Sequence, residues 1–82
     1  MFLHVTDIKH LQDYRIYLKF NDGVEGEIDL TAHLWGKAFE PLKEKDYFKR
    51  VRLDAELGTI CWPNDADFAP EFLQENLSSQ TA

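Results

Sequence analysis

Two neighbouring segments, residues 14–20 and 24–30, alternate between apolar and polar side chains and are separated by only three residues. Alternation with a period of two is typical of a strand that buries one face. Two such strands joined by so short a connection predict an antiparallel hairpin. This hairpin constrains the fold more than any other feature of the chain.

The length of the turn decides which residues pair. A two-residue turn would place Phe20 opposite Glu25 and bring a charge into the core. A three-residue turn instead places Phe20 opposite Val24 and Ile16 opposite Ile28, so that apolar side chains share one face. We therefore predict a three-residue turn over residues 21–23.

The same register also places opposite charges next to each other on the solvent face. It pairs Lys19 with Glu25 and Arg15 with Asp29, although each exposed ion pair contributes only about 0–1 kcal/mol. Gly23, the last turn residue, is predicted to adopt the left-handed conformation that such turns require.

The segments that flank the hairpin predict further elements. Residues 3–9 form a weaker strand that leads into the hairpin, with a bulge near Thr6 and Asp7, where the alternation breaks. After the hairpin, Thr31 can cap a helical turn that ends at Gly36. Asp46 can cap a second turn, residues 47–50.

A second hairpin follows. Matching its apolar faces requires a four-residue loop, 55–58, which pairs Leu53 with Ile60 and Val51 with Trp62.

Pro63 should end this ladder because it has no N–H group. Asp67 can cap a last helix over residues 68–77 that tolerates Pro70 in its first turn. The residues expected to face the sheet share a helical stripe: Phe68, Phe72, Leu73 and Leu77.

This order of elements predicts an α+β fold: a small, mainly antiparallel sheet (β-β-β, short helices, β-β) with a C-terminal helix packed on one face. Eighty-two residues suffice for one domain, expected at 1–77, with a flexible tail at 78–82.

The charge is unevenly distributed. Residues 53–82 hold six acids and no base, and they account for the whole net charge of −6. This acidity argues against direct nucleic-acid binding and suits a basic partner. One cysteine permits no intrachain disulfide, and neither a signal peptide nor a long apolar run is visible. We therefore expect a cytoplasmic protein that does not interact with membranes.

The chain resembles the bacterial family known as domain of unknown function 2442. The most specific part of the likeness is the run Gly-Thr-Ile-Cys-Trp-Pro-Asn-Asp-Ala-Asp at residues 58–67, and the first hairpin and Phe-Glu-Pro-Leu at 39–42 extend it over nearly the whole chain. Where many members have Gly, this chain has Asp65, which tolerates a positive φ better than most residues.

The resemblance implies a small α+β domain. It also implies a gene that often lies beside a small companion gene, in an arrangement like a toxin–antitoxin pair. Some relatives continue into a helix-turn-helix. The resemblance assigns no catalytic residue.

Candidate chemical groups are sparse. Cys61 lies on a predicted strand without a histidine nearby in sequence, so a packed thiol is favoured over a nucleophile. The three histidines, His4, His10 and His33, are too scattered to predict a metal site. No phosphate loop, catalytic triad or cofactor motif is present, so we expect no enzyme and no cofactor.

Two groups of charged residues remain to be interpreted. A basic cluster between Lys43 and Arg52 alternates with acids and is interpreted as a solvated helix face rather than a phosphate site. The carboxylates that follow Pro63 favour local capping, and the alternative is a partner or ligand surface.

The sequence therefore predicts a non-enzymatic protein-binding module, antitoxin-like, whose partner is a small basic protein. The candidate surface comprises an aromatic anchor and four acids: Trp35, Asp65, Asp67, Glu71 and Glu75. The alternative is a small-molecule-sensing regulatory domain with a pocket near Trp62 and Asn64. A homodimer through an exposed strand edge is also expected as an option.

Overall fold

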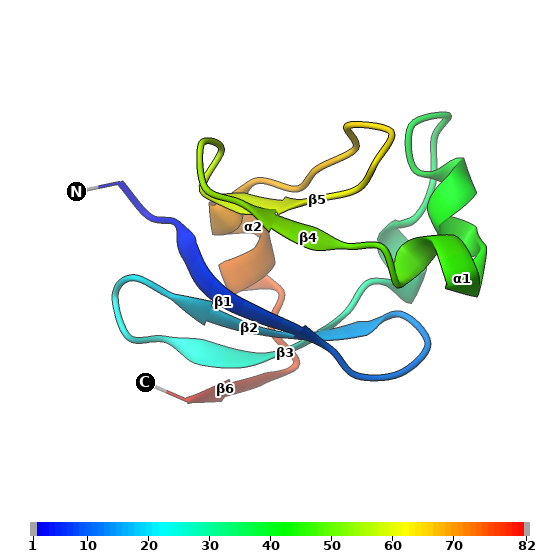
Figure 1. Cartoon of the computed structure of the whole chain (residues 1–82). Helices are drawn as coiled ribbons and strands as arrows, with labels where there is room; N and C mark the ends of the chain where they lie inside the picture. Colours follow the sequence, from blue (N-terminus) through cyan, green and yellow to red (C-terminus); the bar gives the residue numbers. More distant parts are fainter. Residues whose placement is uncertain (1, 82) are drawn as a thin grey trace.

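Two antiparallel sheets and several short helices surround one core in the computed structural model, which describes residues 2–81 (Figure 1). The larger sheet has the order β1-β2-β3-β6, with β1 at Val5–His10, β2 at Arg15–Phe20, β3 at Glu25–Asp29 and β6 at Ser79–Thr81. The smaller sheet pairs β4, Arg52–Asp54, with β5, Thr59–Cys61.

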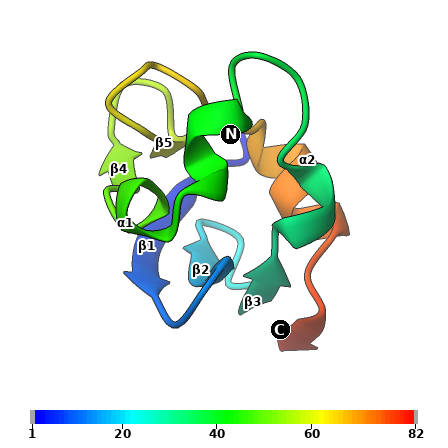
Figure 2. The same cartoon turned by 90° about the vertical axis from the view of Figure 1, so that its right-hand side faces the viewer.

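The helices are all short. Two 3-10 turns, η1 at Thr31–His33 and η2 at Glu40–Lys43, precede α1 at Lys45–Phe48, and α2 spans Pro70–Glu75. Figure 2 shows α1, α2 and the smaller sheet on one side of the larger sheet. The predicted α+β class is confirmed, although the strands form two sheets rather than one. No helix within residues 2–81 is long and apolar enough to cross a membrane.

The predicted register of the first hairpin is confirmed. Ile16 lies opposite Ile28 and Lys19 opposite Glu25. The three-residue turn is closed by the Phe20 N–H, which donates to the Val24 carbonyl at 2.8 Å. Gly23 has a φ of +89°, the left-handed conformation expected of the last turn residue.

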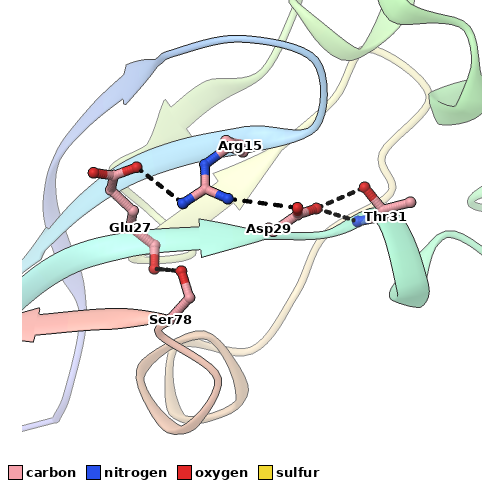
Figure 3. A network of polar contacts seen from close by, with 5 residues as sticks. All are labelled: Arg15, Glu27, Asp29, Thr31 and Ser78. Carbon is pink, nitrogen blue, oxygen red and sulfur yellow. Dashed lines mark hydrogen bonds and ion pairs between the residues drawn. The ribbon is translucent and has the colours of Figure 1, made fainter.

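Polar contacts cover the solvent face of this hairpin (Figure 3). Arg15 forms ion pairs with Asp29 at 3.6 Å, as predicted, and with Glu27 at 3.2 Å. Glu25 accepts a hydrogen bond from the Tyr17 hydroxyl at 3.2 Å. Partial desolvation, and then this carboxylate, raise the pKa of Tyr17.

The first strand carries the predicted bulge. Its pairing with β2 shifts register between Val5 and Asp7, so Thr6 is the extra residue. The Val5 N–H leaves the ladder and donates to the Gly58 carbonyl at 2.8 Å. The bulge thus ties the larger sheet to the loop of the smaller one.

The second hairpin has the predicted four-residue loop and pairs Leu53 with Ile60, but its ladder ends at Arg52 and Cys61, so the predicted pair of Val51 with Trp62 does not form. The Trp62 N–H donates instead to the Ala66 carbonyl at 3.0 Å. The strand ends at Cys61, two residues before Pro63. A tight turn follows, in which the Asp65 N–H donates to the Trp62 carbonyl at 2.9 Å. Asp65 has a φ of +68°, so it adopts the conformation for which glycine is the usual residue.

Three predicted helix caps are wrong. Thr31 lies inside η1, and the carboxylate of Asp29 binds the start of that turn instead. Asp46 lies in the first turn of α1, which begins at Lys45. Asp67 forms an isolated β-bridge with Cys61, so α2 begins only at Pro70. Only for Asp67 does a backbone contact elsewhere, the bridge to Cys61, hold the residue outside the cap position.

The segment predicted as a tail at 78–82 contains the last strand. The backbone of Ser79–Thr81 forms β6, antiparallel to β3. The Ser78 N–H starts this pairing by donating to the Glu27 carbonyl at 2.7 Å, and the Ser78 hydroxyl donates to the same oxygen at 3.1 Å (Figure 3).

The core lies between the two sheets and the helices. Trp62 is completely buried, and its indole N–H donates to the Phe48 carbonyl at 2.9 Å, so its one polar atom is satisfied. The other fully buried large side chains come from every layer: Ile16, Leu18, Phe20, Ile28, Leu30, Leu42, Phe48, Ile60 and Leu73.

Candidate functional site

An apolar groove of about 190 Å³ opens at the surface between the η1–η2 segment and α2. Its lining is one histidine and four large aromatic side chains: His33, Trp35, Phe39, Phe68 and Phe72. A contiguous apolar surface of this kind is a common mark of an interaction site in a small domain. The groove is therefore the candidate functional site.

One wall of the groove is a row of stacked rings. The Phe39 and Phe68 ring centroids are 4.7 Å apart with an interplanar angle of 20°, and those of Phe68 and Phe72 are 5.4 Å apart at 11°. His33 meets Phe72 at 90° and 5.1 Å. Edge-to-face and offset-stacked rings are favourable arrangements that hold one another in place.

The wall from the η1–η2 segment is shaped by local contacts. The carboxylate of Asp29 accepts hydrogen bonds from Thr31 and so starts η1, which carries His33. Gly36, with a φ of +91°, then reverses the chain, and the Phe39 N–H donates to the Gly36 carbonyl at 3.2 Å. A left-handed residue is needed at this reversal, which glycine supplies without strain.

A second contact fixes this segment against the turn that precedes α2. The side-chain amide of Asn64 donates to the Ala38 carbonyl at 3.0 Å, and its oxygen accepts from the Ala66 N–H at 3.2 Å. Asn64 therefore joins two segments that are 26 residues apart in sequence, and these segments carry the two walls of the groove.

Trp35 is the predicted aromatic anchor, and it lines the groove with 72% of its surface exposed. Nothing in its local segment buries the ring, because Gly36 turns the chain away directly after it. An exposed tryptophan beside an apolar groove is the arrangement found at the centre of many protein interfaces.

The four predicted acids are all exposed but lie in two places. Glu71 directly precedes Phe72 in α2. Glu75 follows Phe72 by three residues and lies on the adjacent turn of the same helix. Asp65 lies in the turn that precedes α2, and Asp67 follows that turn. Asp67 pairs with Cys61, whose partner in β4 is Arg52.

The groups beside Arg52 are therefore not the residues that line the groove. The Cys61 thiol is the main cause that raises the pKa of Arg52, and the carboxylates of Asp54 and Asp65 contribute further. Of the four acids, Glu71 lies next to the lining residue Phe72, Glu75 is on the same helix, and Asp67 directly precedes the lining residue Phe68.

The residues predicted for a pocket do not line it. Trp62 is completely buried, and its ring lies 5.9 Å from Phe68, behind the groove wall. Asn64 supports the groove from outside through the contact with Ala38. Trp62 contacts the groove wall through packing, and Asn64 holds the adjoining segments through hydrogen bonds.

Other chemical groups lie apart from the groove. Cys61 is 3% exposed, and its Sγ is 4.0 Å from a carboxylate oxygen of Asp54. No three histidine, cysteine or acidic side chains converge to hold a metal ion within residues 2–81. In the basic cluster, Lys45 forms an ion pair with Asp13 at 3.0 Å and Lys49 with Asp46 at 3.5 Å.

Phe68 and Phe72 were predicted to face the sheet. Phe68 is 8% exposed and belongs to the core, and Phe72 packs against the core while partly exposed, as does Phe39. The signal in the sequence is the density of aromatic residues near the predicted helix, which is more than the observed helix of six residues can cover.

Comparison with known families gives one match. The family described as "Protein of unknown function (DUF2442)" matches residues 5–77 of the chain. Comparisons with curated proteins and with solved structures gave no significant match.

Proposed function

The chain belongs to the DUF2442 family of unknown function, and from this premise we propose that it is a protein-binding module without catalytic activity, whose partner is a small basic protein. The observation that carries the proposal is the exposed Trp35 at the edge of an apolar groove, next to an acidic helix. Interfaces typically combine such an aromatic centre with a polar rim.

The charge of the chain supports a basic partner. The surplus of six acids falls within residues 53–82, the part of the chain that contains α2. Glu71 and Glu75 are exposed on that helix, beside the groove. Charges of one sign around an apolar centre accelerate encounter with an oppositely charged partner and fix its orientation.

The size of the groove favours this proposal over a small-molecule sensor. Pockets that bind drug-sized ligands typically enclose about 300–1,000 Å³, and this groove has about 190 Å³. An antitoxin-like role, in which the chain covers a small basic toxin encoded nearby, is the form of the proposal suggested by the family's gene arrangement.

The first test is co-expression of the tagged chain with the proteins encoded on either side of its gene, followed by pull-down and sizing. A stoichiometric complex with a basic neighbour, weakened by salt, is the expected result, and a toxicity assay of the neighbour alone then tests the antitoxin role. If neither neighbour binds and the chain elutes alone, the proposal fails and ligand screening by thermal shift is the next step.

Charge reversal tests the mechanism within such a complex. The double variant Glu71→Lys, Glu75→Lys should slow association about tenfold at low ionic strength, with a smaller effect at high salt. The variant Asp7→Lys, Glu44→Lys is the matched control, because it makes the same change in charge at two exposed sites outside α2. Equal association rates for the two variants would contradict steering by α2.

A further inference from the structure

The stacked rings determine which kind of group the groove can accept. Phe39, Phe68 and Phe72 form a row of nearly parallel rings. With centroid separations of 4.7 Å and 5.4 Å the rings are offset rather than face to face. A further aromatic ring can join such a row in either favourable geometry, offset-stacked or edge-to-face. An aliphatic side chain of similar size gains only its burial.

The volume of the groove limits the size of the occupant. An apolar cavity of about 150 Å³ accommodates a benzene molecule, so about 190 Å³ is room for a single ring. Trp35, with most of its surface exposed, lies at the solvent side and can cover such a ring. One partner side chain fills this site.

The charges at the groove determine what surrounds that ring. Glu40 follows Phe39, and Glu71 and Glu75 lie on α2, all exposed. The cation nearest in sequence to Trp35 is Lys37. Together with Asp67, which precedes Phe68, these exposed acids outnumber that base and leave a negative rim, which complements basic residues on either side of an aromatic one.

From these observations we infer that the groove binds one aromatic side chain from a basic segment of a partner protein, packed against the rings of Phe39, Phe68 and Phe72. This inference rests on the proposed function and specifies the recognition element.

Three synthetic peptides test the inference with the full chain labelled with ¹⁵N. They are Lys-Lys-Phe-Lys-Lys, the same peptide with Leu in place of Phe, and Glu-Glu-Phe-Glu-Glu. NMR titration follows the Trp35 indole N–H, assigned by its loss in Trp35→Phe, and the backbone amides of α2. The first peptide should shift these signals, the leucine peptide should bind about two- to tenfold more weakly, and the acidic peptide should leave them unmoved.

A matched pair of variants locates the binding. Trp35→Ala should weaken binding of the first peptide, whereas Phe2→Ala should not, because Phe2 is 92% exposed and does not line the groove. Equal binding of the phenylalanine and leucine peptides, binding of the acidic peptide, or no shift with the first peptide would each overturn the inference.

The two proposals can fail separately. If the Trp35→Ala variant forms the partner complex normally, the proposed binding function is supported, but the groove is not the binding site. Selective peptide binding without any neighbour-encoded partner would support the groove chemistry and contradict the neighbour as partner.

Discussion

The carboxylate of Asp29 accepts two hydrogen bonds from Thr31, from the backbone N–H at 2.9 Å and from the hydroxyl at 2.6 Å (Figure 3). These bonds join the end of β3 to the start of η1, which carries His33 into the groove. The same carboxylate pairs with Arg15. One side chain therefore connects the solvent face of the sheet with the wall of the candidate site.

Asp29→Ala should lower the free energy of unfolding by about 1 kcal/mol at pH 7, as loss of a capping carboxylate typically does. The measurement is urea denaturation. Asp29→Asn is the comparison, because an amide oxygen can still accept from the Thr31 N–H. Equal stability of wild type and Asp29→Ala at neutral pH would contradict this role.

The contribution of Asp29 should depend on pH. The hydrogen bonds from Thr31 hold the pKa of Asp29 below its ordinary value of 3.8. A carboxyl whose pKa is lower in the folded state stabilises the protein above its ordinary pKa, and this stabilisation is lost as the pH falls through the folded value. The stability difference between wild type and Asp29→Ala should therefore shrink below about pH 4. A constant difference down to pH 2 would contradict this linkage.

The two tryptophans should differ sharply in their effect on stability. Trp62→Phe removes the shorter of two hydrogen bonds to the Phe48 carbonyl, which keeps the bond from the Val51 N–H, and it leaves a cavity in the core, so we expect a loss of about 2–4 kcal/mol. Trp35→Phe changes a side chain that is 72% exposed and should stay within about 0.5 kcal/mol of wild type. Urea denaturation of both variants makes the comparison, and similar losses would contradict the assigned burial.

Substitution of two glycines by alanine distinguishes the stability cost of backbone strain from that of a steric clash. Both Gly36 and Gly58 have positive φ, but only at Gly58 would a Cβ meet a neighbour, 2.8 Å from the Cβ of His4. Gly36→Ala should cost about 1–2 kcal/mol through strain alone, and Gly58→Ala should cost about 1–3 kcal/mol more. Thermal denaturation should rank wild type, Gly36→Ala and Gly58→Ala in that order; the reverse order of the variants would show that β1 does not pack against Gly58.

Asp65 occupies a left-handed position, with a φ of +68°. Asp65→Gly should leave stability unchanged or raise it by up to about 1 kcal/mol, because relief of strain offsets the greater flexibility of the unfolded chain. Asp65→Ala should lower stability by about 1 kcal/mol, because alanine lacks the tolerance of aspartate for this conformation. Urea denaturation decides the order, and a more stable alanine variant would contradict it.

Local patterns in the sequence determined the strand pairings. The placement of Ile16 opposite Ile28 and of Leu53 opposite Ile60 followed from matching apolar faces across turns of known length. The left-handed turn residue Gly23 and the bulge at Thr6 are likewise local, because each depends on a few consecutive residues.

The helix boundaries and the groove were decided by tertiary structure. Aspartate is a common N-cap residue, but Asp67 pairs with Cys61, and α2 starts only at Pro70. The groove brings Phe39 against Phe68, 29 positions further along the chain, and Asn64 holds the two segments together. A periodic pattern shows that a side chain faces the core, but it does not show which residue it packs against. How much of a ring remains exposed depends on how far the neighbouring segments extend over it, and only the tertiary structure decides that.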